Sequence, residues 1–342
     1  MSGGPARVGV LCLLIAMLGF GLAGAEAQDE FYRGKTVRIV VGFPPGGGYD
    51  TYSRAIARHL AKHIPGKPAI IVENMGGAAS LIAANHAYRV ARPDGLTIVN
   101  FQGNQILGQL LGREGVEFDA RKFAWIGAPT RDNVVCALTR ASGVASVEQW
   151  VAMRTPVKLG STGLGITRDS VSVLQAALGL PVQLVRGYKG TAEIRLAAES
   201  GEVAGGCWPW ESVKATWRRG LEAGEVAIVL QASAAPLPDL PGVPLALDLA
   251  RTDEARQLIQ AGIIVPSSIA RLYALPPATP ADRVRTLRAA FLATLRDPEF
   301  QVEARQSMLE IDPIQADELE RLVAELFKLS PPVAAKLKEL LR

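Results

Sequence analysis

The chain of 342 residues has little cysteine and little histidine, with three of each. Three cysteines are too few for a disulfide-dense scaffold, and no two of them have C-x-x-C spacing. The histidines, His59, His63 and His86, all lie in the first third of the chain. They therefore leave no general base near the serine-containing loop that follows residue 160, which argues against a nucleophilic enzyme.

Familiar enzyme and metal motifs are also missing. His59 and His63 have helical i, i+4 spacing but lack the glutamate of H-E-x-x-H, so we expect no metal site there. The segment Gly34-Lys35-Thr36 resembles the end of a P-loop, yet Asp29 stands where that motif needs glycine. No G-x-S-x-G elbow occurs. We expect neither a cofactor nor catalysis.

Charge is nearly balanced, with 37 basic and 33 acidic residues and no basic block of five or more. This pattern gives no reason to expect a nucleic-acid partner. The hydrophobic fraction of 49% and charged fraction of 20% are typical of a folded chain with a real core, and the length suggests about two domains.

The first 27 residues have the pattern of a secretory signal peptide. Arg7 precedes an apolar run at 8–20, and Ala25-Glu26-Ala27 offers small residues for cleavage. The alternative is an uncleaved membrane anchor, since the apolar run is just long enough to span a bilayer. We expect cleavage, export and a mature chain that begins near Gln28.

Two cysteines, Cys136 and Cys207, remain in the mature chain. They could pair in an oxidising compartment. The alternative is two buried thiols that act as small apolar side chains. We favour the thiols, because both cysteines lie in strand-like runs and nothing else indicates a disulfide.

Short β-branched runs alternate with amphipathic stretches along most of the chain. The run 36–41 predicts a buried strand, and Asp50 is a plausible N-cap for a helix that reaches Ile64. Such alternation indicates parallel βαβ units in two α/β groups, near 36–125 and 134–230, followed by a helical tail. Open parallel sheets bind ligands beyond the carboxyl ends of their strands, so we expect the site in a cleft between the groups.

The most informative stretch is Gly42-Phe43-Pro44-Pro45-Gly46-Gly47-Gly48-Tyr49-Asp50, which follows a predicted strand and opens a predicted helix. Consecutive glycines let backbone N–H groups approach a ligand closely. The helix N-terminus behind them adds partial positive charge. We predict a cradle for an anion or carboxylate rather than a plain tight turn. The spacing differs from the dinucleotide fingerprint G-x-G-x-x-G.

Two further loops occupy equivalent places in the second α/β group. The loop 161–167 is rich in hydroxyls and glycine, which suit a carboxylate. The loop 187–191 offers Tyr188 and Lys189, while Thr191 is predicted to cap the following helix.

The segment Trp208-Pro209-Trp210 ends a predicted strand. An indole at the cleft would suit an aromatic or extended ligand. Core packing is the equally weighted alternative, because tryptophan is mostly buried in folded proteins.

Several segments together resemble one known family. In chain order they are Pro-Gly-Gly-Gly-x-Asp at 45–50, Val72-Glu73-Asn74, Pro93-Asp94-Gly95, Tyr188-Lys189-Gly190-Thr191, Leu237-Pro238-Asp239-Leu240-Pro241 and Asp297-Pro298-Glu299-Phe300. The chain is similar to the periplasmic solute-binding proteins of the tripartite tricarboxylate transporter type, also called the Bug family. This resemblance extends over essentially the whole mature chain.

The resemblance implies a type II periplasmic-binding-protein fold, with two Rossmann-like α/β domains and a ligand cleft between them. Residues 28–130 and 242–342 would form the first domain and residues 131–241 the second. The implied protein is a monomeric periplasmic receptor that closes around a small organic carboxylate. It would deliver this ligand to the large and small membrane subunits of a transporter. Two alternatives to a transport receptor are a binding module that reports to a membrane sensor kinase and a secreted hydrolase that uses the same cleft.

Both the pattern and the resemblance assign the ligand contacts to the loops that face the cleft. The expected residues are Phe43, Pro45, Gly46, Gly47, Gly48, Tyr49, Asp50, Gly77, Ala78, Asn104, Ser161, Thr162, Gly163, Thr167, Tyr188, Lys189, Gly190, Thr191 and Trp208.

Overall fold

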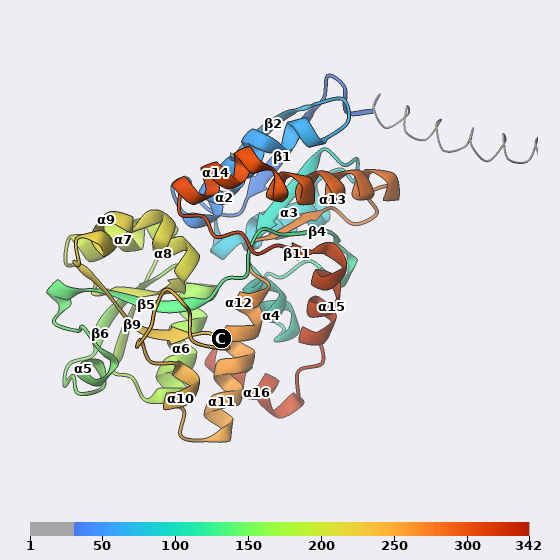
Figure 1. Cartoon of the computed structure of the whole chain (residues 1–342). Coiled ribbons are helices and arrows are strands. Elements are labelled where there is room, and N and C mark those ends of the chain that lie inside the picture. The colour runs from blue at the N-terminus through green and yellow to red at the C-terminus, as the bar shows by residue number, and fades with distance from the viewer. Residues whose placement is uncertain (1–30, 342) are drawn as a thin grey trace, which may run out of the picture.

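The computed structural model describes residues 31–341 (Figure 1). The predicted signal peptide, residues 1–27, and its cleavage site lie outside the described residues. Within residues 31–341, no helix is both long enough and apolar enough to cross a bilayer.

The first sheet has six strands in the order β11-β4-β10-β3-β1-β2. β1, β2 and β3 are parallel, as the alternation of strands and helices predicts, whereas β10 runs antiparallel between β3 and β4. Its strands are β1 (Thr36–Val41), β2 (Ala69–Asn74), β3 (Thr97–Phe101), β4 (Ala124–Ala128), β10 (Leu272–Leu275) and β11 (Ile314–Gln315). This sheet and the helices that cover it are called the first lobe below.

The second sheet has five strands in the order β7-β6-β8-β5-β9. β6 is parallel to β7 and β8, and β5 is antiparallel to β8 and β9. Its strands are β5 (Val134–Thr139), β6 (Val157–Ser161), β7 (Val182–Arg186), β8 (Gly205–Pro209) and β9 (Val226–Ala232). This sheet and its helices are called the second lobe.

The helices that follow the strands cover both sheets (Figure 1). Before the helical tail they are α2 (Gly48–Leu60), α3 (Leu81–Arg89), α4 (Asn104–Leu110), α5 (Val147–Val151), α6 (Ile166–Leu178), α7 (Thr191–Glu199), α8 (Trp210–Thr216) and α9 (Arg218–Glu222). The tail contributes α10 (Ala246–Leu249), α11 (Asp253–Ile259), α12 (Val265–Ser268), α13 (Ala281–Arg296), α14 (Pro298–Gln306), α15 (Ala316–Leu326) and α16 (Pro331–Leu340).

The helical tail contacts both lobes. α13 packs on β4 and α2, and α14 packs on α2, so these helices cover the first sheet. α10 packs on β9, and α11 and α16 pack on α6, all in the second lobe. The boundaries predicted at 130 and 242 stay a prediction.

Strand β1, which lies between β3 and the edge strand β2, explains where the glycine-rich loop lies. Val37, Ile39 and Val41 are wholly buried in a cluster with Tyr52, Ile56 and Leu60 of α2, and β1 is hydrogen-bonded to β2 on one side and to β3 on the other. The carboxyl end of this buried strand therefore delivers the loop at 42–48 to the edge of the sheet that faces the second lobe.

The expectation of two free thiols is wrong in this structure, because Cys136 and Cys207 form a disulfide. The two residues stand directly opposite each other in the antiparallel pair of β5 and β8. Directly opposed side chains on neighbouring strands are close enough to bond. The pairing depends on strand register, which the one-dimensional pattern does not contain.

Candidate functional site

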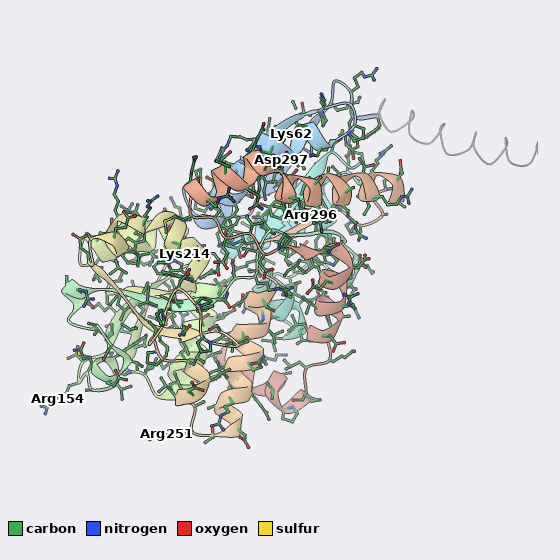
Figure 2. All side chains as sticks on the ribbon, viewed as in Figure 1. Lys62, Arg154, Lys214, Arg251, Arg296 and Asp297 are labelled. Carbon is green, nitrogen blue, oxygen red and sulfur yellow. A yellow bond between two sulfur atoms is a disulfide. The ribbon has the colours of Figure 1, made fainter. Side chains whose placement is uncertain are left out.

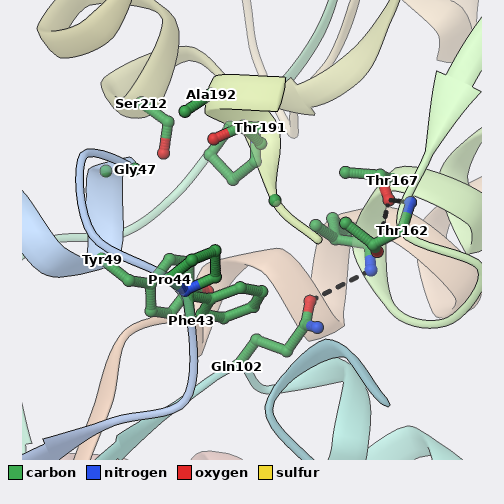
Figure 3. Close-up of a pocket in the computed structure, with 14 residues that line it drawn as sticks. Phe43, Pro44, Gly47, Tyr49, Gln102, Thr162, Thr167, Thr191, Ala192 and Ser212 are labelled. Atoms are coloured by element: carbon green, nitrogen blue, oxygen red, sulfur yellow. Dashed lines mark hydrogen bonds between the residues drawn. The ribbon is translucent and has the colours of Figure 1, made fainter. Parts of the chain in front are cut away.

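A narrow cavity of about 30 Å³ lies between the two lobes (Figure 3). That volume holds about one water molecule. Its lining residues are all uncharged: Phe43, Pro44, Gly47, Gly48, Tyr49 and Gln102 from the first lobe, and Thr162, Ile166, Thr167, Gly190, Thr191, Ala192, Pro209 and Ser212 from the second.

The N-termini of three helices converge on this cavity. The lining includes the first residues of α2, α6 and α7, whose N-cap residues are Gly47, Gly165 and Gly190. All three N-cap residues are glycines and so offer no capping side chain of their own. Helix N-termini present N–H groups and partial positive charge, which favour an anion. The N-caps also correct two sequence predictions, since Asp50 and Thr191 lie inside the first turns of α2 and α7.

Hydrogen bonds to the carboxylate of Asp50 fix the conformation of the glycine-rich loop. Its buried carboxylate accepts hydrogen bonds from the Gly46 N–H (3.0 Å), from Arg54 Nε (2.9 and 3.0 Å) and from Asn74 Nδ2 (2.8 Å). Burial opposes ionisation, but these donors hold the pKa of Asp50 below its usual value. The ionised carboxylate therefore fixes the loop and lies outside the cavity lining.

Two positions of this loop require glycine, each for a different structural reason. Gly46 has a φ of +82°, which favours glycine. A Cβ on Gly48 would lie 2.2 Å from Ser212 Oγ of α8. Gly48 is therefore needed because α2 and α8 approach each other closely.

The loop after β6 is closed by its own hydroxyls. Thr167 Oγ1 accepts a hydrogen bond from the Thr162 N–H at 3.0 Å, and the two hydroxyl oxygens lie 2.8 Å apart. Thr162 Oγ1 lies 2.6 Å from the carbonyl oxygen of Leu164, to which it donates. These contacts fix the second-lobe wall of the cavity.

Gln102 joins the two lobes at the cavity. Its Oε1 accepts a hydrogen bond from the N–H of Ile166 at 3.0 Å (Figure 3), and its Nε2 donates to the carbonyl oxygen of Ala79 at 2.6 Å. A side chain from the first lobe thus caps the N-terminus of α6. The sequence interpretation missed Gln102, although its place directly after β3 was a usable signal.

The predicted residues fall into three groups. Eight line the cavity: Phe43, Gly47, Gly48, Tyr49, Thr162, Thr167, Gly190 and Thr191. A second cavity of about 520 Å³ shares Pro44 and Thr162 with the first, and is also lined by Pro45, Gly77, Ala78, Tyr188 and Lys189. Neither lining includes Gly46, Asp50, Asn104, Ser161, Gly163 or Trp208.

Trp208 lies in the core of the second lobe instead of at the cleft. It is wholly buried, and its ring stacks on that of Trp217 with centroids 5.6 Å apart. Its neighbour Pro209 is the residue that reaches the cavity. Side chains alternate between the two faces of a strand, so adjacent residues of β8 point in opposite directions. The indole is therefore a packing element of this lobe.

Other lining residues went unpredicted. Ile166, Ala192 and Ser212 lie at the starts of α6, α7 and α8, and Pro44 lies in the first loop. Pro44, Ile166 and Ala192 are apolar residue types that carry no chemical signal of a ligand site. Only their position at helix starts beyond the strands could have indicated them.

Polar contacts across the lobes accompany the closed cavity. Arg113, after α4, bonds Asp169 of α6 at 2.9 Å, and both side chains are buried. Lys214 of α8 bonds Glu310 of the first lobe at 2.5 Å, and Figure 2 shows Lys214 where α8 faces that lobe. Ion pairs therefore link the two lobes at α6 and at α8.

His59 of α2 faces Glu303 of α14, and His63, which lies just after α2, faces Asp297, the N-cap residue of α14. His63 Nε2 lies 2.9 Å from Asp297 Oδ2, and His59 Nε2 lies 2.7 Å from Glu303 Oε2. His59, Asp297 and Glu299 are close enough to share a metal ion. Lys62 Nζ lies 2.8 Å from Asp297 (Figure 2) and 2.6 Å from Glu299, so an ammonium group already forms an ion pair with each of these carboxylates.

No family model matches the chain. Among curated proteins, a UPF0065 protein of Cupriavidus necator is 36% identical over 93 residues, which are 27% of each chain. Protein BugT of Bordetella pertussis is 31% identical over 90 residues, which are 25% of this chain and 27% of BugT. The chain spans between 27% and 59% of the length of the curated relatives that it matches.

Solved structures match over nearly the whole chain. The periplasmic binding protein BugD has a TM-score of 0.72 and 21% identity, with 90% of this chain and 98% of BugD covered. The chain is therefore similar to BugT in part of its sequence and to BugD in its fold. MatC from Rhodopseudomonas palustris, solved with bound malate, has a TM-score of 0.68 and 20% identity over 90% of this chain and 99% of its own. The resemblance to Bug proteins and the type II periplasmic-binding-protein fold predicted from the sequence are both confirmed.

Proposed function

We propose that the chain is a periplasmic receptor that captures a small organic carboxylate between its two lobes. The observation that carries this proposal is the convergence of three glycine-capped helix N-termini, from both lobes, on one uncharged cavity. An ionised carboxylate suits such N–H groups without any cationic side chain. MatC with malate and an R. palustris relative with adipate support this ligand class.

Capture would proceed by closure of the lobes. A cavity of about 30 Å³ is too small for an acid of several carbon atoms, so the lobes must move apart to admit one. A ligand shifts the equilibrium towards closure only through contacts that the open form lacks. A carboxylate held by α2 on one side and by α7 on the other makes such contacts.

The captured acid would pass to the large and small membrane subunits of a tripartite tricarboxylate-type transporter. The export pattern at the N-terminus supports a periplasmic location. The lining holds no nucleophile with an adjacent base, which supports binding rather than catalysis. We propose that closure moves the domain of residues 131–241 against that of residues 28–130 and 242–342, with the protein acting as a monomer.

Mass spectrometry of compounds released from freshly purified protein tests the ligand class. We expect a small carboxylic acid, and calorimetry should show that it rebinds with one site per chain. The release of an uncharged compound, or chemical conversion of the acid during incubation, would contradict the proposal.

A further inference from the structure

A fully buried arginine lies directly behind the cavity. Arg271 precedes β10, and its backbone has a φ of 50°, a conformation that a residue other than glycine rarely adopts. Its guanidinium lies between the rings of Tyr49 and Tyr52, 4.8 Å and 4.3 Å from their centroids. Arg271 Nε donates to Asp132 Oδ1 at 2.6 Å. The surrounding residues thus hold the guanidinium in one orientation.

The guanidinium also reaches across to the second lobe. Arg271 Nη2 donates a hydrogen bond to Ser212 Oγ at 2.7 Å. Ser212 is 2% exposed and belongs to the lining of the cavity. Because a guanidinium only donates, the serine oxygen is the acceptor and its own proton remains available.

That proton has no acceptor among residues 31–341 in this structure. The Arg271 bond is the only one that engages the Ser212 hydroxyl within the described part of the chain. The backbone of Gly48 closes one side of the oxygen, since a Cβ there would lie 2.2 Å from it. A hydroxyl that accepts from a cation is polarised and becomes a stronger donor.

Resting on the function proposed above, we infer that Ser212 is a carboxylate-recognising residue and that Arg271 is its positioning residue. The hydroxyl donates to an oxygen of the bound acid, while the guanidinium polarises it from behind. The arginine itself does not contact the acid, because the serine stands between it and the cavity. This arrangement transmits positive potential into a lining without charged side chains, and it favours an ionised acid over its neutral amide.

The test compares acids with their amides. Malate, adipate and benzoate, each beside its amide, are titrated into wild-type protein and into Ser212→Ala. We expect the wild type to bind at least one acid about tenfold more tightly than its amide, and Ser212→Ala to lose most of that preference while amide affinity changes little. A merely structural role would weaken acid and amide alike.

Ser233→Ala is the matched control, because Ser233 is equally buried in the second lobe and donates to the carbonyl of Ala235. It should keep the wild-type preference. If Ser212→Ala does not fold, Ser212→Cys retains the size and replaces the hydroxyl with a weak donor. Arg271→Lys should give an intermediate preference.

The outcomes separate this inference from the function it rests on. Wild-type protein that binds none of the three acids contradicts the proposed carboxylate receptor and this inference with it. Wild-type protein that binds an acid, with a preference that Ser212→Ala leaves unchanged, overturns the role of Ser212 alone.

Discussion

The backbone N–H of Ile166 donates to Oε1 of Gln102, 3.0 Å away, so that a first-lobe side chain caps a second-lobe helix. The amide oxygen thus satisfies one of the N–H groups that a carboxylate would otherwise bind. Because Gln102 is anchored to Ala79 through its other amide atom, the bond ties the lobes together in the absence of a ligand.

Gln102→Ala should favour the open form of the free protein. The loss of one neutral hydrogen bond, about 1 kcal/mol, changes the ratio of open to closed molecules about fivefold. Small-angle X-ray scattering of ligand-free protein should then give a larger radius of gyration than the wild type.

Gln105→Ala is the control for this variant. The Gln105 amide also bonds the carbonyl oxygen of Ala79, together with that of Ala78, and both partners are in its own lobe. Its scattering should match the wild type. Equal scattering from both variants and the wild type would show that Gln102 does not hold the lobes together.

The glycine-rich loop shows how far sequence reasoning reaches at the site. Its position between a strand and a helix indicates a ligand cradle. In the structure, five residues of the stretch 42–50 line the cavity: Phe43, Pro44, Gly47, Gly48 and Tyr49. Which glycine is essential does not follow from the pattern. Gly47 has a φ of −87°, which any residue can adopt, and a Cβ there would make only ordinary van der Waals contacts, with Thr191 Oγ1 at 3.6 Å and the Pro44 carbonyl oxygen at 3.9 Å. Gly48 is the restricted position, because α8 arrives from a distant part of the sequence.

Gly48→Ala should therefore weaken binding far more than Gly47→Ala. The new methyl group would clash with Ser212 and push α2 away from α8. We expect at least a tenfold loss of affinity, about 1.4 kcal/mol, for the acid released from the purified protein. Calorimetry checks this, with Gly47→Ala as the control that binds normally. Similar affinities for both variants would contradict the close-approach argument.

Some strands could be predicted from the sequence and others could not, for a physical reason. β1, β2 and β3 carry β-branched runs between glycine or proline turns, so their local pattern is sufficient. β10 was missed because Leu272–Leu275 is four residues long and lies within a helical tail. Its antiparallel place between β3 and β4 depends on contacts with residues more than 140 positions earlier in the chain. The place of Trp208 was also beyond the local pattern. Whether its side chain lies at the cavity or in the core depends on which face of β8 it occupies, and the sequence does not show this.

The disulfide between Cys136 and Cys207 gives a prediction for the secreted form. It closes a loop with a sequence separation of 71 residues. A cross-link over such a loop contributes about 4 kcal/mol by restricting the unfolded chain. Reductant, or the double variant Cys136→Ala/Cys207→Ala, should lower the melting temperature by several degrees.

Alkylation of the denatured, unreduced protein checks the pairing directly. Mass spectrometry should find no label on mature protein exported to an oxidising compartment, and two labels after reduction. Two labels without prior reduction would contradict the disulfide. A wild-type melting temperature that reductant leaves unchanged would contradict its contribution to stability.

Glu211 gives the last prediction, on the dependence of stability on pH. Its carboxylate is 1% exposed and accepts bonds from the backbone N–H and Nδ2 of Asn133 at 3.0 and 3.2 Å. Burial, reinforced by the neighbouring Asp132, raises the pKa of Glu211 from 4.5 to about 8. The folded protein therefore keeps this proton up to about pH 8, while the unfolded chain releases it near 4.5.

Between those two values the folded state binds more protons than the unfolded state, so stability falls as pH rises. The glutamine side chain in Glu211→Gln does not titrate. This variant should therefore lack the part of the decline in the free energy of unfolding that Glu211 causes, which is up to about 1.4 kcal/mol per pH unit. Chemical unfolding of both proteins from pH 5 to pH 8 measures the difference, in which the contributions of groups that do not interact with Glu211 cancel. The exposed Glu222→Gln is the control that should follow the wild type. Parallel curves for wild type and Glu211→Gln would mean that Glu211 is already ionised in the folded protein at pH 5.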